Sequence, residues 1–499
     1  MKRIYALFVA VSVVCSLYAD IPAGLSVEGN YDENTYIRIE TLSGNEAALV
    51  YYRTTSEHAI IPSVVSVVHE GSEYELPITA IAPSDYNIFH SYESPVSVEI
   101  PNSVEIIGNN AFSHCSSLEI VKMGDGVKII EDDAFYQCGL TSVDIPASVE
   151  SIGDDAFAIC TSLASVEMGD GVKSVGESAF DYCESLVSVE ISNSVKIIGD
   201  YAFHGCESLT SIYIPVSVTN IGHNAFGWCP DLESITVDKK NPYYDSREGC
   251  NAVIKTAMNE LVVGCKNSFI PSSVTGIGES AFLYCESLTS LDIPANVESI
   301  GDGAFYGCSS LETVKIGDGV RSIEGDAFTG CFSLESVYCA ALTPPEIDCY
   351  NNYEDDWYLP FDYYFGEWND AEGWWLEQPM PTTLYVPEEA IERYKDAEWW
   401  GKGECEEDSD YPYGQRCEYF QIIKPMSEGT GTEDVREDDG FAVYVRDGVI
   451  YVEETEEEVE VYDVTGRKVY DGEKGAIPVG RPGVYIVRSG ENVEKVVAG

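Results

Sequence analysis

Hydrophobic and polar positions repeat every 23 residues through the middle of this chain. In one copy, apolar Leu163, Val166 and Met168 are interleaved with small or polar residues, which is typical of a half-buried β-strand. A Gly-Asp-Gly turn follows, two valines return to the interior, and Phe180 and Cys183 complete the unit. A fixed period of this length predicts a solenoid, in which each coil buries its apolar side only against its neighbours.

Each copy carries Ala-Phe and then a cysteine three residues after the phenylalanine. Because one cysteine recurs at the same phase of every coil, we expect these thiols to pack as small apolar side chains rather than to form disulfides. The phenylalanines are Phe112, Phe135, Phe157, Phe180, Phe203, Phe226, Phe282, Phe305 and Phe328. Their cysteines are Cys115, Cys138, Cys160, Cys183, Cys206, Cys229, Cys285, Cys308 and Cys331.

The repeat can be written IP-x-SV-xx-IG-xx-AF-xx-C-x-SL, and in this form it resembles the BspA-like leucine-rich repeats of bacterial surface proteins. The resemblance covers residues 96–345, with an insertion at about 238–270. It implies a leucine-rich-repeat solenoid, with a parallel β-sheet on one wall and a short helical or irregular wall opposite. It also implies a surface-displayed protein that mediates adhesion to, or recognition of, host or bacterial protein or glycan ligands.

Residues 1–19 have the pattern of a secretory signal peptide. Lys2 and Arg3 precede an apolar run, and Ala19 supplies a small residue at the expected cleavage position. We therefore expect a secreted or cell-surface protein, associated with the outer membrane. Residues 20–95 contain strand-like runs and a degenerate first coil, as expected of a cap that ends a solenoid.

Residues 346–425 form an acidic, tryptophan-rich region. Its tryptophans either bury their rings against the last coil as a cap, or form an aromatic platform that stacks on sugar rings. The segment TTLYVPEEAIERYKDAEWW resembles the closing cap of BspA-like proteins, which favours the cap, with a short helix at Glu388–Glu398. The tryptophans of the region are Trp357, Trp368, Trp374, Trp375, Trp399 and Trp400.

A polar linker at 426–440 precedes a last domain at 441–499. Short strand patterns separated by Asp-Gly and Thr-Gly turns predict a small antiparallel β-sandwich there. The elements VYDVTGRKV and PGVYIVR resemble the C-terminal sorting domain of the type IX secretion pathway of Bacteroidota. That resemblance implies passage across the outer membrane, and the alternative is an inert terminal β-domain.

Cysteines outside the repeats are expected to behave differently from the repeat thiols. In an exported chain, cysteines that enclose a short irregular segment favour a local disulfide. Three pairs fit this description, namely Cys250 with Cys265, Cys339 with Cys349, and Cys405 with Cys417.

The formal net charge of −58, from 86 acidic and 28 basic residues, excludes several functions. Nucleic acid and anionic lipid both require clustered lysine and arginine, so we expect neither as a partner. No later run of about 18 apolar residues exists, so no transmembrane segment is expected. No cofactor motif, metal-ligand spacing or catalytic constellation stands out, and His204 and His223 are expected at the surface in turns. The sequence therefore favours a binding protein rather than an enzyme, with no cofactor or metal.

The alternation of side chains along each strand predicts a candidate binding surface. The repeat strands should form one parallel sheet, starting at Leu118, Leu140, Leu163, Leu186, Leu209, Leu232, Leu288, Leu311 and Leu334. On each strand, the residues two and four after the leading leucine should point away from the core. The first such row is mostly serine, which leaves the second row prominent, with an acidic centre. Its candidate ligand-binding residues are Lys122, Asp144, Glu167, Glu190, Tyr213, Thr236 and Asp292. The competing interpretation is a structural surface spacer without a specific ligand.

Overall fold

The computed structural model describes residues 4–5, 23–32, 34–43, 45–82, 87–89, 95–348, 350–351, 357–358, 361, 368–369, 374–375, 382–397, 400, 420 and 422–426, and the strands between 442 and 498. These residues divide into two compact units. The first comprises Met1–Glu312, Gly319–Leu334 and Pro345–Gln378, and the second Thr313–Asp318, Glu335–Pro344 and Pro379–Gly499. Most of the expected signal peptide, 1–19, lies outside the described residues, so it stays a prediction.

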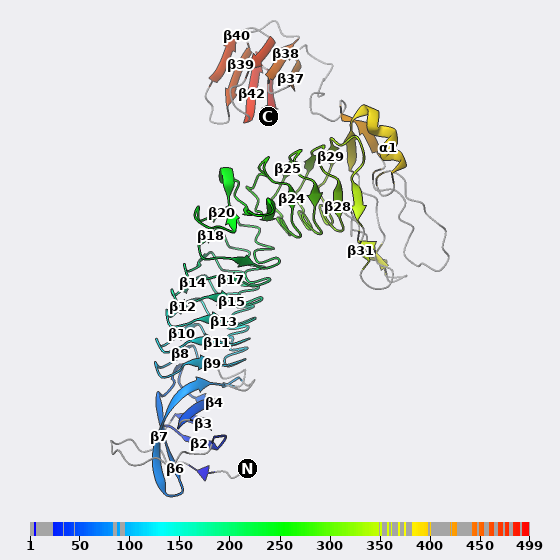
Figure 1. Ribbon diagram of the computed structural model, residues 1–499. Helices are drawn as coiled ribbons and strands as arrows, with labels where there is room; N and C mark the ends of the chain where they lie inside the picture. Colours follow the sequence, from blue (N-terminus) through cyan, green and yellow to red (C-terminus); the bar gives the residue numbers. More distant parts are fainter. Residues whose placement is uncertain are drawn as a thin grey trace. The chain divides into compact units, whose positions relative to one another are not determined.

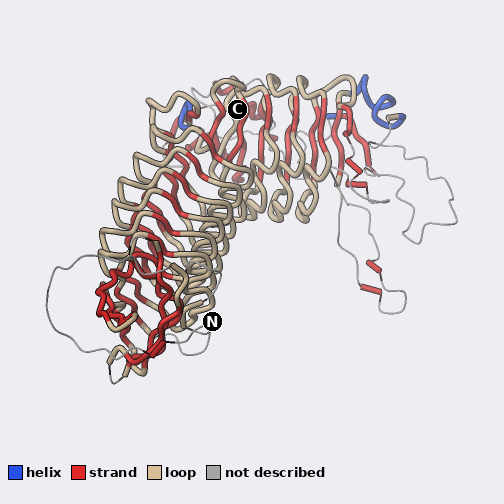
Figure 2. Tube along the Cα trace, turned by 60° about the horizontal axis from the view of Figure 1, so that its bottom comes forward, coloured by secondary structure: helices blue, strands red, loops and turns tan. Residues whose placement is uncertain are grey.

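A single coil shows how the repeat folds. Strand β14 (Ser165–Met168) forms a long-strand side, β15 (Ser174–Val175) forms a short-strand side, and consecutive turns over 177–182 form a turn side. Side chains of β14 are alternately exposed and buried, as expected of a half-buried strand. Gly171 lets the corner approach the preceding coil, because a Cβ atom there would overlap the carbonyl oxygen of Ala147. Figure 2 shows the strands of successive coils side by side, joined by turns.

Eight long strands pair in parallel in the order β5-β8-β10-β12-β14-β16-β18-β20 (Figure 1). The predicted parallel pairing of the repeat strands is confirmed, but the prediction of one sheet is wrong. The sheet ends at β20, because the chain leaves the repeat pattern there to form the insertion, and β25 (Ser290–Ile293) lies outside this sheet. The bounds are β5 (His58–Ile60), β8 (Ser97–Glu99), β10 (Ile120–Lys122), β12 (Ser142–Ile145), β16 (Ser188–Glu190), β18 (Ser211–Ile214) and β20 (Ser234–Val237).

The short strands form a second parallel ladder, which continues into the N-terminal region. There β7 pairs with β9 in parallel, and antiparallel β2, β3 and β4 extend the same sheet. A hairpin partner, β6, lies against β7, and β1 pairs with β2. The bounds are β1 (Ile4–Tyr5), β2 (Ser26–Asn30), β3 (Thr35–Leu42), β4 (Glu46–Thr54), β6 (Val64–His69), β7 (Ser72–Ile81), β9 (Ile106–Ile107), β11 (Ile129–Ile130), β13 (Ser151–Ile152), β17 (Ile197–Ile198) and β19 (Asn220–Ile221).

The insertion folds into antiparallel strands that start a further short-strand ladder. Strands β21, β22 and β23 are antiparallel, and β23 pairs in parallel with β24 of the next coil. Within residues 95–348 the only helical segment is η1, so the side opposite the long strands consists of short strands and turns rather than helices. The bounds are β21 (Tyr244–Asp245), η1 (Arg247–Gly249), β22 (Val253–Lys255), β23 (Glu260–Val263), β24 (Gly276–Ile277), β26 (Ser299–Ile300), β28 (Ser322–Glu324) and β30 (Glu346–Asp348).

Cys250 and Cys265 of the insertion are buried free thiols, so the expected disulfide between them is wrong. The Cys250 thiol donates to the carbonyl of Ala252 and that of Cys265 to the carbonyl of Asn251, with distances of 3.8 and 3.4 Å. Cys339 is also a free thiol, which contradicts its expected pairing with Cys349. The third expected pair, Cys405 with Cys417, lies outside the described residues.

The repeat phenylalanines stack into ladders along the interior. Rings of successive coils from Phe112 to Phe226 lie 4.9 to 5.5 Å apart between centroids. A second ladder runs from Phe282 to Phe328 and continues to Phe361, with spacings of 5.0 to 5.1 Å. The nine repeat cysteines are all buried and free. The prediction that these phenylalanines and cysteines fill the core is confirmed.

In the second unit, β27, β29, β35 and β36 form a parallel sheet, and a short helical segment follows β35. This segment, η2 with α1, runs from Glu388 to Asp396, where the sequence predicts a helix. The ring of Trp400 is 1% exposed and lies 5.2 Å from that of Tyr394 in α1, which favours the cap interpretation for this tryptophan. The bounds are β27 (Thr313–Ile316), β29 (Ser336–Cys339), β35 (Thr383–Val386), η2 (Glu388–Ala390), α1 (Ile391–Asp396) and β36 (Ile422–Pro425).

The remaining strands are short hairpins and a C-terminal β-sandwich. One antiparallel sheet contains β37, β38 and β41, and the other contains β39, β40, β42 and β43. Strands β37 and β43 lie against each other, which joins the two sheets as the predicted small sandwich. The hairpin strands are β31 (Tyr350–Asn351), β32 (Trp357–Tyr358), β33 (Trp368–Asn369) and β34 (Trp374–Trp375). The sandwich strands are β37 (Ala442–Arg446), β38 (Val449–Glu453), β39 (Val459–Asp463), β40 (Lys468–Gly472), β41 (Gly475–Pro478), β42 (Gly483–Ser489) and β43 (Asn492–Ala498).

Candidate recognition surface

The candidate residues from the sequence all lie on the outer face of the long strands. Each is exposed, because the outward position of a strand alternates with buried valine, isoleucine or leucine. Six of them belong to strands β10 to β20 of one sheet, whereas Asp292 lies on β25 and is not brought into that sheet. The exposed residues are Lys122, Asp144, Glu167, Glu190, Tyr213, Thr236 and Asp292.

Three carboxylates meet at the centre of this face. Asp144 lies directly opposite Glu167, and Glu167 lies directly opposite Glu190, on neighbouring parallel strands. We call these three residues the acidic stripe. Among the described residues, none of the three has an ion-pair or hydrogen-bond partner for its side chain. Neighbouring strands are about 4.8 Å apart, so the like charges repel one another.

Three glutamates elsewhere on the coils are neutralised by lysines. On the short-strand side, Lys128 pairs with Glu105 at 2.7 Å, and Lys173 pairs with Glu150 at 2.5 Å. At the start of the long-strand row, Lys122 pairs with Glu99 at 2.8 Å. Each of these three glutamates is balanced by a lysine of the next coil, whereas the three carboxylates of the acidic stripe are not.

Smaller side chains flank the acidic stripe. Ser165 lies opposite both Ser142 and Ser188 in the sheet, and all three are exposed. A serine row beside longer carboxylates leaves a shallow, hydroxyl-lined shelf next to the acidic stripe. Such a face can accept hydrogen bonds and ion pairs from a partner, and solenoids present extended faces of this kind.

Tyr213 connects the row to the start of the insertion. Its hydroxyl donates to the Asp238 carboxylate with an oxygen–oxygen distance of 2.6 Å. This hydrogen bond raises the pKa of Tyr213 and lowers the pKa of Asp238. Thr236 lies directly opposite Tyr213 on β20, so the last two candidates of this sheet are neighbours.

The turn side carries a cluster of aromatic residues that the sequence analysis missed. His204, expected at the surface, is buried, and its Nδ1 lies 2.8 Å from Asp181 Oδ1. His223 is half-buried, and its Nδ1 lies 3.7 Å from Glu279 Oε1. The expectation of surface histidines is therefore wrong for His204, because rings of neighbouring coils cover it. The sequence does contain a signal for this aromatic cluster, because tyrosine or tryptophan occurs two residues after the repeat phenylalanine in several copies.

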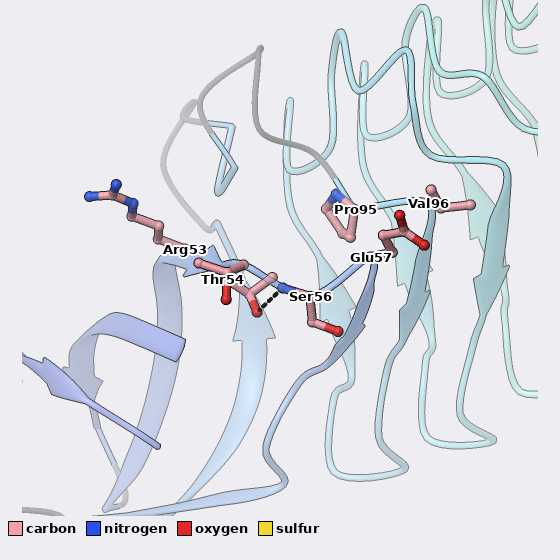
Figure 3. Close-up of a pocket in the computed structure, with 7 residues that line it drawn as sticks. Arg53, Thr54, Ser56, Glu57, Pro95 and Val96 are labelled. Carbon is pink, nitrogen blue, oxygen red and sulfur yellow. Dashed lines mark hydrogen bonds between the residues drawn. The ribbon is translucent and has the colours of Figure 1, made fainter. Parts of the chain in front are cut away.

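One small cavity of about 340 Å³ lies where the N-terminal region meets the first coils. Figure 3 shows Arg53, Thr54 and Ser56 along one side and Glu57 beside Pro95 and Val96. The Thr54 hydroxyl accepts a hydrogen bond from the Ser56 backbone at 3.1 Å. The Ser56 hydroxyl in turn accepts a hydrogen bond from the His58 backbone at 3.1 Å, so neither hydroxyl is paired with the Glu57 carboxylate as an activated nucleophile would be.

Metal binding and membrane crossing find no support in the described residues. No group of three or more histidine, cysteine, aspartate or glutamate side chains there could hold a metal ion. Within the same part of the chain, no helix has both the length and the apolar character that membrane crossing requires.

Comparison with known families gives one match. Residues 85–186, 128–248 and 260–352 match the family described as BspA type leucine rich repeat region, with six copies. No curated protein is similar enough to match the chain.

Solved structures of several bacterial repeat proteins resemble the chain. A leucine rich cell surface protein from Faecalibacterium prausnitzii A2-165 is 27% identical, with 65% of this chain and 89% of that one covered and a TM-score of 0.47. The pneumococcal vaccine antigen PcpA is 17% identical, with 74% and 96% covered and a TM-score of 0.47. A leucine-rich repeat protein from Bacteroides ovatus ATCC 8483 is 24% identical, with 60% and 92% covered and a TM-score of 0.32.

Proposed function

Since the chain belongs to the BspA-type leucine-rich repeat family, we propose that it is a secreted or cell-surface protein that recognises an extracellular ligand. The ligand is a host or bacterial protein, or a glycan, that presents basic or hydroxyl groups to the long-strand face. The acidic stripe and Tyr213 are its central contacts. No catalytic role and no cofactor are part of this proposal.

The observation that carries this proposal is the unbalanced acidic stripe. Carboxylates directly opposite each other on parallel strands destabilise the fold, by about 0.2–1 kcal/mol for a pair. A partner that supplies lysine or arginine converts this repulsion into ion pairs, and the gain is largest where water is excluded. Three adjacent, unpaired carboxylates on one strand face suit a cationic partner, and this local arrangement favours the recognition hypothesis over the spacer.

The tryptophan-rich region is less favoured as the ligand site. Trp400, the one tryptophan of that region whose side chain is described, is buried between Tyr394 and Phe420 and cannot stack on a sugar. A glycan platform there would rest on the other tryptophans, whose side chains lie outside the described residues.

Export and display complete the proposal. Lys2, Arg3 and the apolar run after them suit a signal peptide. The β-sandwich of β37 to β43 suits a type IX sorting domain that carries the protein across the outer membrane. A net charge of −58 keeps an exported protein soluble and directs it toward basic partners.

The test is a binding screen of the full-length protein against purified extracellular matrix proteins and a glycan array, followed by titration of each hit. Neutralising the stripe with Glu167→Gln and Glu190→Gln should weaken binding of a true ligand about tenfold, because two charge-assisted contacts are lost. The interaction should also weaken as salt rises.

The matched control is Asp125→Asn with Asp170→Asn. Both aspartates are exposed acids in turns that follow long strands, away from the outer strand face. This control removes the same net charge and should leave the affinity unchanged. A hit whose affinity is the same for both double variants would place the ligand elsewhere on the protein.

A further inference from the structure

Three aromatic rings form a continuous strip on the turn side of the solenoid. Trp228 stacks on Tyr284 with centroids 4.7 Å apart, and its other edge meets Tyr182 at 5.7 Å. All three side chains are half-buried, so part of each remains accessible. We call Tyr182, Trp228 and Tyr284 the aromatic strip. It lies on a different side of the coils from the acidic stripe.

The aromatic strip continues across the insertion, whereas the phenylalanine ladder of the interior is interrupted there. Phe226 and Phe282 are not stacked on each other, because Gly264 of the insertion lies against the Phe282 ring. On the surface, however, the Trp228 backbone donates to the Leu283 carbonyl at 3.2 Å. This bond brings Trp228 onto Tyr284 and lets the aromatic strip cross the point where the insertion leaves the solenoid.

The residues of the strip occupy a repeat position with a left-handed backbone, which in other coils holds His114, Gln137, Ile159 or glycine. Tyr182, Trp228 and Tyr284 each have a φ of +52°, a left-handed conformation that residues other than glycine adopt rarely. The equivalent positions of two neighbouring coils are Gly205 and Gly307. A Cβ atom on Gly205 would lie 3.1 Å from the Tyr182 ring, and one on Gly307 would overlap the Tyr284 ring. Glycine in one coil thus makes room for a ring from the coil before it.

The charged groups that influence the two tyrosines of the strip are carboxylates. Besides burial, the charges of Asp181 and Glu207 raise the pKa of Tyr182, and the charge of Glu286 raises the pKa of Tyr284. Asp181 also accepts the His204 hydrogen bond, which fixes its position beneath the rings. Burial raises the pKa of the neighbouring Cys285 and Lys266 lies close enough to lower it in part, but the Lys266 ammonium is paired with Glu233 at 3.0 Å. Burial raises the pKa of Tyr284 to about 12, so its ring stays neutral in extracellular fluid.

We propose that the aromatic strip is a second binding site, which takes arginine or lysine side chains from an extended segment of a partner protein. Aromatic faces attract cations, and arginine also stacks on them through its planar guanidinium group. The carboxylates at the edge of the strip can pair with the same cation. Successive rings along the solenoid suit successive side chains of an extended peptide.

Charge complementarity favours a cation over a neutral saccharide. A sugar ring can stack on tyrosine or tryptophan, but its hydroxyls require both donors and acceptors around it. The carboxylates Asp181, Glu207 and Glu286 supply acceptors, and the donors of the strip are limited to its own tyrosine hydroxyls and the Trp228 indole N–H. A net charge of −58 also draws cationic segments toward the surface.

The test uses the full-length protein and three probes: a blocked glycine peptide with two arginines, its citrulline counterpart, and maltohexaose. Calorimetric titration at physiological salt should show binding of the arginine peptide and about tenfold weaker binding of the neutral citrulline peptide. Trp228→Ala should weaken arginine-peptide binding about tenfold, and Trp228→Phe, which keeps an aromatic face, should restore most of it. Glu207→Gln with Glu286→Gln should weaken it by a similar factor.

Two control variants separate the strip from general acidity and general aromatic exposure. Asp170→Asn removes an exposed acid elsewhere on the coils, and Tyr243→Ala removes an exposed ring from the insertion, so neither should change the affinity. Equal binding of the arginine and citrulline peptides, or unchanged binding by both the Trp228→Ala and the double glutamine variants, would overturn the proposal. So would Trp228-dependent binding of maltohexaose without binding of the arginine peptide. If Trp228→Ala loses its thermal transition, the double glutamine variant, which changes charge but hardly shape, decides alone.

Discussion

The Cys183 thiol donates a hydrogen bond to the carbonyl of Phe157 in the preceding coil, across 3.3 Å. The same bond recurs from Cys138, Cys160, Cys206, Cys229, Cys308 and Cys331, with distances of 3.1 to 3.4 Å. Cysteine therefore does more than fill space at this position. Its sulfur is small and apolar enough for the core, and its S–H group gives the carbonyl a donor that alanine could not supply.

The repeat thiols should be unreactive in the folded protein. Burial raises the pKa of Cys160 and Cys229 to about 12, and the reactive thiolate is therefore scarce at neutral pH. At pH 8, a maleimide reagent should label none of the nine repeat cysteines until the protein is unfolded in guanidinium. Mass spectrometry of labelled peptides measures this, and rapid labelling of Cys183 in the native protein would contradict it.

The same burial predicts loss of stability in alkali. A thiol whose pKa rises from 9.0 in the unfolded chain to about 12 in the fold stabilises the protein fully below pH 9 and loses that contribution as pH rises toward 12. Each such thiol then contributes about 1.4 kcal/mol of destabilisation per pH unit. The melting temperature should fall steeply above pH 9. A Cys183→Ala variant should melt lower than wild type at pH 7 but show a shallower alkaline decline.

Asp155 predicts the same direction of pH dependence at lower pH, with stability falling as pH rises. Burial, together with Asp133, Asp181, Asp154 and Glu177, raises its pKa from 3.8 to about 6. A raised folded pKa means that the fold gains stability as pH drops through 6 toward 4, where the carboxyl becomes neutral. Asp155→Asn should therefore raise the melting temperature at pH 7.5 and give no advantage at pH 4.

Two further variants provide a parallel case and a control for Asp155→Asn. The pKa of Asp302, raised to about 6 mainly by burial, predicts the same behaviour for Asp302→Asn. Asp170→Asn, at an exposed turn, should give no pH-dependent gain. An Asp155→Asn advantage that persists unchanged at pH 4 would argue against charge burial as its cause.

The acidic stripe should be destabilising in the absence of ligand. Glu167→Gln removes the central charge between Asp144 and Glu190 and should raise the free energy of unfolding by about 0.5 kcal/mol at low salt. In 1 M salt the gain should nearly vanish, because the Debye length falls to about 3 Å. Thermal melts at two salt concentrations measure it. Glu150→Gln, which leaves Lys173 without its partner, should give no such gain.

The C-terminal sandwich can be tested in the native host. If it is a sorting signal, deletion of 441–499 should leave the protein in the periplasm while the repeats still fold. Cell fractionation and protease accessibility measure its location, and circular dichroism of the purified truncation measures its folding. Normal surface display of the truncated protein would rule the sorting role out.

Contacts between neighbouring coils could be anticipated because they join positions one period apart. The parallel pairing of Ser165 with Ser188, the interior place of Phe180 and Cys183, and the outward place of Glu167 all follow from the phase of each residue in the repeat. Local periodicity is enough here, since a solenoid has few contacts other than those between neighbours.

The insertion is where this reasoning failed. Cys250 and Cys265 enclose a short segment, yet each thiol donates to a separate backbone carbonyl, those of Ala252 and Asn251 just before β22. The end of the long-strand sheet at β20 has the same origin. A period contains no information about how a non-repeating segment folds back on the coils.

The sequence by itself determined the solenoid, its core ladders and the row that contains the acidic stripe, because all three depend on spacing along the chain. Only the tertiary structure decided that Asp144, Glu167 and Glu190 lack partners while other acids have lysines, since pairing depends on side-chain reach. The contact between Trp228 and Tyr284 is likewise visible only in the tertiary structure. That contact requires the insertion to loop out so that two coils far apart in sequence become neighbours, and the aromatic strip exists because the backbone bond from Trp228 to Leu283 closes that gap.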